Sequence, residues 1–303
     1  LAIGADMYKP AEYLYGENDA VFTHLEIGEQ IAKSNEAVVN AQSLVMIQCV
    51  GSRNEEFNYC SRVCCGHAVK NALKLKEKNP DMRIYILFRD MRTYGFKEDA
   101  YRKASELGVQ FIRYTPEDPP EVEAVSEGGS DMIRVTVTDP ILGQRLELDA
   151  DILSLAAAVR PPASIQEIAG LFKVTLSPDD FFKEAHVKLK PVEFAADGVF
   201  LCGTAHYPKH IPETINQAYG AAGRAITLLS HDTVVASGSV AKVDEYACVS
   251  CGACITACTY DAIQFHDTKK GKKAIVNPIL CKGDGLCNAK CPTNAIVLKH
   301  FTN

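Results

Sequence analysis

Twelve cysteines constrain this 303-residue chain more than any other feature of its sequence. Eleven of them fall in two short regions, residues 49–65 and 248–291, and only Cys202 stands apart. Disulfide frameworks belong mostly to small secreted proteins, which have too little core to fold without them. A chain of this length has room for about two domains with cores of their own. The grouping therefore favours metal ligation by reduced thiols.

Composition excludes several other classes of protein. The formal net charge of −6 argues against a general nucleic-acid binder, because such proteins usually carry a basic excess. No apolar run approaches the roughly 18 residues that cross a bilayer, so we expect no transmembrane segment. We find no signal peptide, and we expect a reducing, cytoplasmic location. The chain opens on Leu1–Ala5, which resembles the end of a buried strand, and we expect an N-terminally truncated protein.

The second cysteine region contains an internal repeat. Residues 259–263 and 292–296 are similar and follow the last cysteine of each half. The halves are Cys248-x2-Cys251-x2-Cys254-x3-Cys258 and Cys281-x2-Asp284-x2-Cys287-x3-Cys291. In this spacing three thiolates surround one iron-sulfur cube and the fourth points toward a second cube. Zinc would need separate groups of four ligands, which the spacing does not favour. The stretch 236–239 has the composition of a linker, and we predict a separate domain at 236–303.

Residues 240–300 resemble bacterial-type ferredoxins with two [4Fe-4S] clusters. The resemblance implies one cluster on Cys248, Cys251, Cys254 and Cys291, and another on Cys281, Asp284, Cys287 and Cys258. Asp284 departs from the pattern, which has cysteine there, and a carboxylate is a harder ligand than a thiolate. Three outcomes stay open: aspartate ligation, which we favour, a water or hydroxide on that iron, or a three-iron [3Fe-4S] cluster. The lysine run at 269–273 is expected to form a solvated turn, with a docking patch for an acidic partner as the alternative.

Residues 43–115 predict a βαβ unit that carries the first cysteine region. Alternating apolar strands and helices indicate a doubly wound parallel sheet, in which ligands gather beyond the carboxyl ends of the strands. The predicted strands cover 43–50, 83–89 and 109–113, and the predicted helices 60–78 and 96–107. Cys49, Cys60, Cys64 and Cys65 lie where a dinucleotide-binding unit carries its glycines. We therefore predict an iron-sulfur cluster in the place of a nicotinamide nucleotide.

The expected geometry of this first site follows from its spacing. We expect Cys60 and Cys64 to share a helical face and Cys49 to approach from the end of the strand. The helix N-terminus, with Arg53 and Arg62, would stabilise the anionic thiolates. The alternative is a set of free cysteines packed in a core, which four cysteines in 17 residues disfavour.

The rest of the body contains a second kind of motif. We predict a hairpin over 131–149, a buried strand over 151–162, a strand over 196–204 that contains Cys202, and a helix over 212–229. Residues 197–203 resemble the second flavin motif of thioredoxin-reductase-type disulfide oxidoreductases. The resemblance implies a partial, thioredoxin-reductase-like doubly wound α/β flavoprotein domain at 1–235. It also implies FAD contacts from Asp197, Gly203, Thr204 and Thr214, with Asp197 on the ribityl chain.

The order of these motifs resembles HdrA, the iron-sulfur flavoprotein of heterodisulfide reductase, and its bacterial relatives. That resemblance implies an oxidoreductase component that moves electrons between FAD and three [4Fe-4S] clusters, with flavin-based electron bifurcation and no acid-base or nucleophilic residue. It implies a hetero-oligomer, or a dimer, with other subunits of the complex and with ferredoxin or hydrogenase- or dehydrogenase-type electron donors. Three departures are the missing N-terminal Gly-rich motif, Ala158 in place of glycine, and Asp284. The alternatives are a ferredoxin-fused NAD(P)H-dependent flavin oxidoreductase and a non-catalytic ferredoxin-bearing scaffold.

Overall fold

A five-stranded parallel sheet forms the centre of the first part of the chain. The computed structural model describes residues 1–127, 130–233 and 239–299. The strand order is β2-β9-β3-β4-β5, and all neighbours run parallel. The strands are β2 (Val21–Thr23), β3 (Ser43–Val50), β4 (Arg83–Phe88), β5 (Gln110–Arg113) and β9 (Ile152–Ala157). Strand β3 is almost wholly apolar because it is covered on both faces. The predicted α/β fold class is confirmed.

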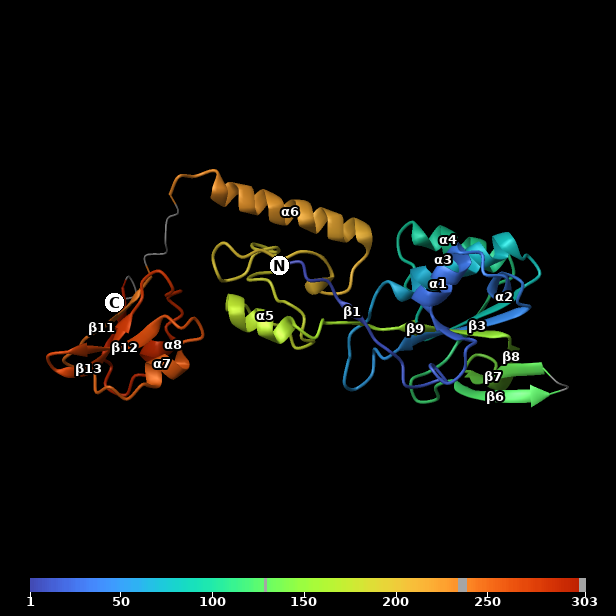
Figure 1. Cartoon of the computed structure of the whole chain (residues 1–303), viewed down its shortest axis with the longest axis horizontal. Coiled ribbons are helices and arrows are strands. Elements are labelled where there is room, and N and C mark those ends of the chain that lie inside the picture. Colours follow the sequence, from blue (N-terminus) through green and yellow to red (C-terminus); the bar gives the residue numbers. More distant parts are fainter. Residues whose placement is uncertain (128–129, 234–238, 300–303) are drawn as a thin grey trace.

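Helices cover one face of this sheet and a second sheet covers the other (Figure 1). Met46 and Ile86 point to the helical side, whereas the neighbouring Val45 and Leu87 point to the second sheet. The helices are α1 (His24–Ala32), α2 (Glu36–Val39), α3 (Cys64–Lys78) and α4 (Lys97–Glu106). The antiparallel second sheet consists of β6 (Glu121–Glu127), β7 (Ser130–Asp139) and β8 (Gln144–Ala150). The predicted hairpin at 131–149 is therefore formed by β7 and β8.

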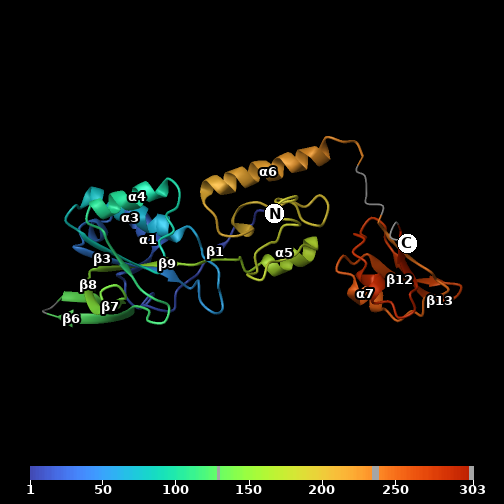
Figure 2. The same cartoon turned by 180° about the vertical axis from the view of Figure 1, so that it is seen from behind.

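A second, smaller part of the body follows β9. Strand β10 (Val159–Arg160) pairs with β1 (Asp6–Met7) where the chain leaves the large sheet. The second part holds α5 (Ile165–Phe172), a 3-10 turn η1 (Gly203–Ala205) and the long helix α6 (Ile211–Leu229). Its core contains Phe182, Phe194 and Leu201. Figure 2 shows this part beside the large sheet, with the N-terminus of the chain in it.

The strand expected at 196–204 is not formed as a regular strand. Only an isolated bridge joins Glu193 to Phe200, and the N–H of Cys202 donates to the carbonyl of Leu1. The N–H of Phe194 also donates to Val199 O and the N–H of Leu201 to Val192 O, but these contacts do not form a regular ladder, and the chain turns into η1 directly afterwards. The helix expected at 212–229 is confirmed, and it carries Pro212 in its first turn.

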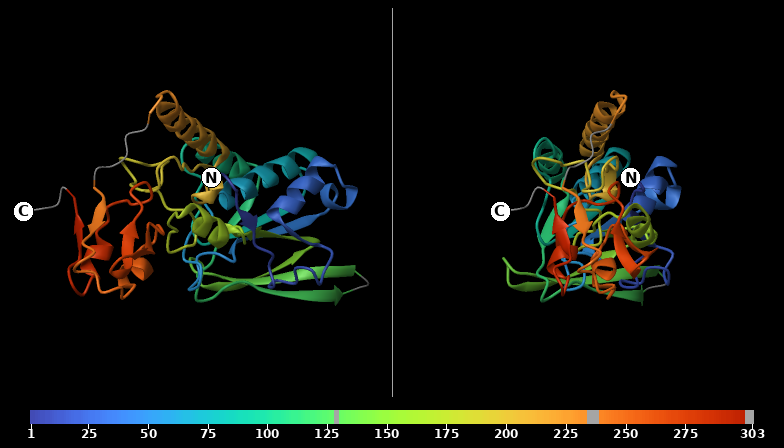
Figure 3. Two further views of the ribbon diagram at one scale, coloured as in Figure 1. Left: turned by 60° about the vertical axis from the view of Figure 1, so that its left-hand side comes forward. Right: turned by 90° about the vertical axis from the view of Figure 1, so that its left-hand side faces the viewer.

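The C-terminal part is a small domain with two-fold internal similarity. Strand β11 (Ala241–Val243) pairs with β14 (Ile296–Leu298), and β12 (Ile263–Thr268) pairs with β13 (Gly271–Val276). Two short helices, α7 (Ala253–Ala257) and α8 (Leu286–Ala289), follow the cysteine loops. Figure 3 shows the domain next to the second part of the body. The predicted linker and boundary at 236 lie largely outside the described residues. Within the described ranges, no helix has the length and apolar character that crossing a membrane requires.

Candidate functional site

The first cysteine region gathers at the carboxyl end of strand β3. Cys49 is the seventh residue of that strand and has a left-handed backbone with φ 65°. Cys64 and Cys65 form the first turn of α3, and Cys60 lies in the loop before it. Cys65 is buried, whereas the other three side chains are half-buried. The site therefore occupies the sheet edge where α/β proteins bind their ligands.

The prediction that Cys60 and Cys64 share a helical face is wrong. Helix α3 begins at Cys64, four residues later than expected. Arg62 has φ 62°, a left-handed conformation that a right-handed helix cannot contain. Cys60 thus approaches the site from an independent loop rather than from the helix.

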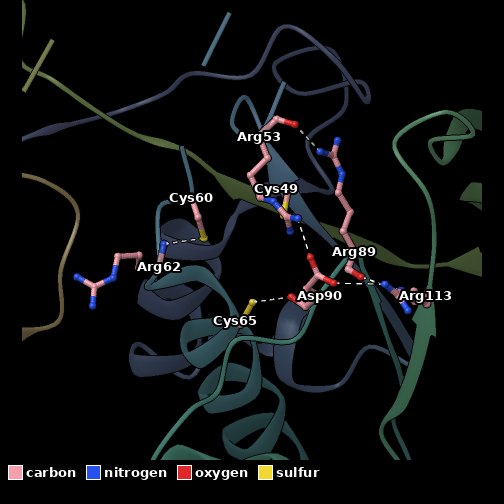
Figure 4. Close-up of polar contacts among 8 residues, drawn as sticks. All are labelled: Cys49, Arg53, Cys60, Arg62, Cys65, Arg89, Asp90 and Arg113. Carbon is pink, nitrogen blue, oxygen red and sulfur yellow. Dashed lines mark hydrogen bonds and ion pairs between the residues drawn. The ribbon is translucent and has the colours of Figure 1, made fainter. Parts of the chain in front are cut away.

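Cationic side chains surround these cysteines (Figure 4). Arg53 Nη1 lies 3.9 Å from Cys49 Sγ, and Arg53 Nη2 lies 2.6 Å from Asp90 Oδ2. Arg113 binds the other oxygen of Asp90 at 3.3 Å. The backbone N–H of Arg62 donates to Cys60 Sγ at 3.2 Å. Arginine charge and a backbone donor therefore both point at sulfur, which is the surrounding that an anionic thiolate site requires.

The four thiols act on one another electrostatically. Burial raises the pKa of Cys64, and the neighbouring Cys49, Cys65 and Cys60 raise it further. Burial also raises the pKa of Cys49, against the opposing effect of Arg53 and Arg89. Bound iron supplies the positive charge that four converging thiolates need. The cysteine chemistry, the burial and the sulfur-directed donors fit a cluster at this position.

In the C-terminal domain, the cysteines of each implied cluster are neighbours. Four of them line one cavity of about 20 Å³: Cys248, Cys251, Cys254 and Cys291. Around the other set, burial raises the pKa of Cys287, and the charges of Asp284, Cys281 and Cys258 raise it further. Backbone N–H groups donate to sulfur on both sides, from Ala262 to Cys258 at 3.4 Å and from Ala295 to Cys291 at 3.2 Å.

Asp284 sits in the position of the missing cysteine. Its side chain is exposed, and its Oδ1 accepts a hydrogen bond from the N–H of Leu286 at 3.1 Å. The charge of its carboxylate also raises the pKa of Cys287, a predicted ligand of the same cluster. Nowhere in residues 1–127, 130–233 and 239–299 do three or more His, Cys, Asp or Glu side chains converge as a single metal ion requires. A cube spreads its ligands over four iron atoms, so its thiolates stand farther apart.

Three of the four predicted flavin residues come together at the start of α6. A Cβ atom on Gly203 would lie 3.6 Å from Thr214 Cγ2, and Gly203 has φ 78°. The N–H of Gly203 donates to Gln217 Oε1 at 2.9 Å, and Lys209 donates to its carbonyl. Thr204 follows within the same 3-10 turn. The positive end of the α6 dipole therefore lies beside this group.

Asp197 lies at the other end of α6. It lines a cavity with Leu228, which stands about 21 Å from Thr214 at the helical rise per residue. Its carboxylate forms an ion pair with Lys282 of the C-terminal domain at 2.7 Å.

Sequence reasoning missed a cavity of about 610 Å³ between α3, α4 and the start of α6. Val63, Gly66, Lys70, Leu73 and Glu77 line it from one face of α3. Across from them lie Lys97, Lys209, His210 and Pro212. The three-to-four-residue spacing along α3 was the available signal, because such positions share a helical face.

The polar groups of this cavity favour an anionic aromatic ligand. His210 Nε2 is buried without a hydrogen-bond partner. Burial lowers the pKa of Lys209 to about 8, and the side chain is almost fully enclosed. The size falls in the range of small-molecule and cofactor sites. The unpartnered His210 nitrogen and the four lysines that line the cavity, Lys70, Lys74, Lys97 and Lys209, fit a flavin ring.

Arg62 lies between the first cysteine site and the first turn of α6. Its guanidinium donates to Pro208 O at 3.1 Å and Tyr94 Oη at 2.9 Å. It also pairs with Glu213 Oε1, in the first turn of α6, at 2.8 Å. Since its own N–H donates to Cys60, Arg62 joins the first cysteine site to Glu213, which follows the cavity-lining Pro212.

Comparison with known proteins agrees with this arrangement. Residues 247–295 match the 4Fe-4S dicluster domain family. The HdrA component of the ferredoxin:CoB-CoM heterodisulfide reductase of Methanosarcina acetivorans is 35% identical over 90% of this chain and 33% of its own length. The HdrA iron-sulfur component of the CoB-CoM heterodisulfide reductase of Methanocaldococcus jannaschii is 36% identical over 99% of this chain and 47% of its own length.

The chain thus spans between a third and a half of these curated relatives. Among solved structures, thioredoxin reductase of T. acidophilum superposes with a TM-score of 0.48 and 13% identity, over 76% of this chain and 65% of that one. The match to the Methanocaldococcus jannaschii relative extends over both cysteine regions and the segment around α6. The chain therefore belongs to the HdrA family of heterodisulfide reductase components.

Proposed function

We propose that this chain is the electron-transfer part of a heterodisulfide-reductase-type complex, in which electrons move between FAD and [4Fe-4S] clusters. The Methanosarcina acetivorans relative is named for a reaction between ferredoxin and the CoB-CoM heterodisulfide. We propose that this protein takes part in the reduction of a disulfide coupled to ferredoxin. It would do so in the cytoplasm and together with other subunits. The remaining electron carriers would come from those subunits, from ferredoxin, or from proteins of the hydrogenase or dehydrogenase type.

The contact made by Arg62 carries this proposal. A purely structural cysteine cluster would need no link to a ligand cavity, but Arg62 binds Cys60 through its backbone and Glu213 through its side chain. Arg62 therefore fixes the thiolate site against the first turn of α6, whose Ile211 and Pro212 line the cavity. A short, fixed separation between two redox groups is the condition for electron exchange between them.

We assign the body cluster to Cys49, Cys60, Cys64 and Cys65. The two clusters of the C-terminal domain are assigned to Cys248, Cys251, Cys254 and Cys291, and to Cys258, Cys281, Asp284 and Cys287. For the flavin, the 610 Å³ cavity would hold the ring. Gly203, Thr204 and Thr214 lie close to it, because the lining residue Lys209 donates to the carbonyl of Gly203. Asp197, predicted to bind the ribityl chain, lies instead at the other end of α6, away from this cavity. A flavin accepts two electrons, whereas each cluster accepts one, so we propose that electron pairs are divided here by bifurcation.

The residues around the cavity would stabilise a negative charge on the ring. Lys70, Lys97 and Lys209 supply positive charge, and the start of α6 adds its dipole. His210 supplies a hydrogen-bonding nitrogen that has no partner within the described residues. The apolar side chains Val63 and Leu73 exclude water on the α3 side.

Iron and flavin analysis of the anaerobically reconstituted chain tests the proposal. We expect about 12 iron atoms per chain from three four-iron clusters. Cys60→Ser should remove about four of them, because one cube then loses a ligand. Cys202→Ser serves as the matched control, since Cys202 belongs to neither cysteine region. Unchanged iron in Cys60→Ser would show that the body cysteines hold no cluster.

Asp284 is tested separately by spin resonance on the oxidised protein. Aspartate ligation predicts no three-iron signal in an anaerobic preparation, and Asp284→Cys should keep the iron content unchanged. Asp284→Ala should convert that cluster to the three-iron form, with loss of about one iron atom. A full three-iron signal in the unsubstituted protein would contradict aspartate ligation.

A further inference from the structure

We infer that the C-terminal domain docks on the body through the side that carries Cys258, Cys281, Asp284 and Cys287, here called the Asp284 side. The cluster proposed for that side then faces the body, and the cluster of Cys248, Cys251, Cys254 and Cys291 faces away. That these cysteines hold clusters rests on the proposed function, but the docking itself does not.

The first contact is an ion pair next to a predicted cluster ligand. Lys282 follows Cys281 directly, and its Nζ lies 2.7 Å from Asp197 Oδ2 on the body. The Lys282 side chain is 22% exposed, which is low for a lysine and shows that the neighbouring surfaces cover it. Asp197 belongs to the cavity at the far end of α6.

The second contact comes from the other half of the internal repeat. Asp261, three residues after the predicted ligand Cys258, forms an ion pair with Lys173 of the body. Lys173 is the residue that ends α5, where the helix dipole is negative and the ammonium is favoured. Both contacts therefore adjoin ligands of the same predicted cluster, although they are distant from each other in the sequence.

The charges of the two contacts are complementary in both directions. One lysine lies on the C-terminal domain and the other on the body, each facing an aspartate of the opposite part. Reversing the domain would set other side chains against Asp197 and Lys173. The arrangement thus selects one orientation of the domain.

The opposite side of the domain is turned away from the body. The hairpin of β12 and β13 lies at the end of the molecule farthest from α5 and α6 in both views (Figures 1 and 2). This hairpin contacts the other predicted cluster, because Lys273 donates to the carbonyl of Cys248 and Ser250 donates to that of Lys272. Cys248, a predicted ligand of that cluster, therefore lies next to the outward hairpin.

The strength of this docking is expected to depend on salt. Surface ion pairs contribute little individually and are screened by ions. The two parts belong to one chain, however, so the contact forms at a high effective concentration. Docking should consequently be strong at low ionic strength and weak at high ionic strength.

Zero-length carbodiimide cross-linking of the full reconstituted chain, followed by peptide mass spectrometry, tests the inference. A carbodiimide joins an amine to a carboxylate only when they touch. We expect the Lys282–Asp197 and Lys173–Asp261 links at low salt. Both should fall severalfold at about 1 M salt, where the Debye length is about 3 Å.

Charge reversal makes the test specific. Lys282→Glu should reduce the remaining Lys173–Asp261 link severalfold, because it sets two carboxylates against each other. Adding Asp197→Lys to that variant should restore the Lys173–Asp261 link. The matched control is Lys272→Glu, the same charge change on the outward hairpin, which should leave both links unchanged.

Two results would overturn the docking. One is a Lys173–Asp261 link that is unaffected by Lys282→Glu, and the other is a set of links that joins the β12–β13 lysines to the body. Iron and flavin are counted in the same samples. If the chain binds its full iron and flavin but neither link forms, the docking is refuted and the proposed function is not. If both links form but the chain binds neither cofactor, the proposed function is refuted and the docking is not.

Discussion

Arg53 is the side chain whose charge acts most directly on the body cysteines. It touches Cys49 Sγ at 3.9 Å and is held in place by Asp90. Reduction adds negative charge to a cluster, and a nearby cation stabilises the reduced form. Arg53→Gln should therefore lower the reduction potential of the body cluster by about 60 mV, the one-electron equivalent of about 1.4 kcal/mol. Potentiometric titration followed by spin resonance measures this shift.

Two further variants decide whether charge is the cause. Arg53→Lys keeps the positive charge and should retain most of the potential. Arg102→Gln removes an equal charge from the exposed face of α4, where Arg102 pairs with Asp99. It should leave the potential unchanged. If Arg53→Lys lowers the reduction potential as much as Arg53→Gln does, Arg53 acts through loop geometry rather than through its charge.

His24 makes the stability of the body depend on pH. Burial, together with the charge of the neighbouring His67, lowers the pKa of His24 to about 3. The neutral ring bridges Ser154 Oγ at 2.7 Å and the Gln48 side chain at 2.8 Å. The unfolded chain takes up a proton near the ordinary histidine pKa, whereas the folded protein does not. The stabilisation from His24 is thus fully present above about pH 6.5 and is lost as pH falls toward 3.

The contribution of His24 to the pH dependence of the unfolding free energy can be isolated with His24→Gln. Below about pH 6, His24 should contribute a loss of up to about 1.4 kcal/mol of unfolding free energy per pH unit. Glutamine retains a donor and an acceptor but does not titrate, and His67, whose pKa burial lowers to about 4, is present in both proteins. Denaturant unfolding between pH 7 and pH 5 gives the comparison. Equal slopes for the two proteins would rule out His24 as the titrating group.

At the scale of elements, the start of α6 depends on a capping box. Glu213 accepts from the N–H of His210 at 2.9 Å and pairs with Arg62. Glu213→Ala should lower the unfolding free energy by about 1 kcal/mol, the usual value of a lost cap, with little from the partly exposed ion pair. Glu167→Ala, in the first turn of α5, serves as the control because α5 has no side-chain cap. Denaturant titration of both variants should show the loss of unfolding free energy in Glu213→Ala and not in Glu167→Ala.

The elements of the large sheet were predictable where burial is strong. Strands β3, β4 and β9 are runs of apolar residues covered on both faces, and such runs stand out in a sequence. Strand β2 was missed because its three residues are too few to show a period. The start of α3 was misplaced because the left-handed backbone of Arg62 leaves no mark in the residue pattern.

The sites were predictable to different degrees for a similar reason. The C-terminal ligands follow from local spacing, since a tight loop and one helical turn fix their geometry. The 610 Å³ cavity joins α3 to α6, about 140 residues later, and no local pattern reports that contact. The Lys282–Asp197 pair is equally remote in sequence. Local chemistry was therefore accessible from the sequence, whereas contacts between distant segments required the fold.

At the scale of the whole molecule, the body site should function without the C-terminal domain. All residues that line the 610 Å³ cavity lie between 63 and 212, and the body cysteines lie between 49 and 65. The two parts meet through surface ion pairs, which are weak individually. A chain that ends at residue 233 should consequently fold, retain its flavin and hold about four iron atoms.

Iron analysis and the visible spectrum of this shortened chain measure the outcome. Cys60→Ser in the same shortened chain is the matched control, and it should bring iron close to zero while the flavin stays bound. The reason is physical: with the eight other ligands removed, every remaining iron atom must depend on the body cysteines. A shortened chain that binds flavin but no iron would mean that the body cluster needs the C-terminal domain, and the division into independent sites would then be wrong.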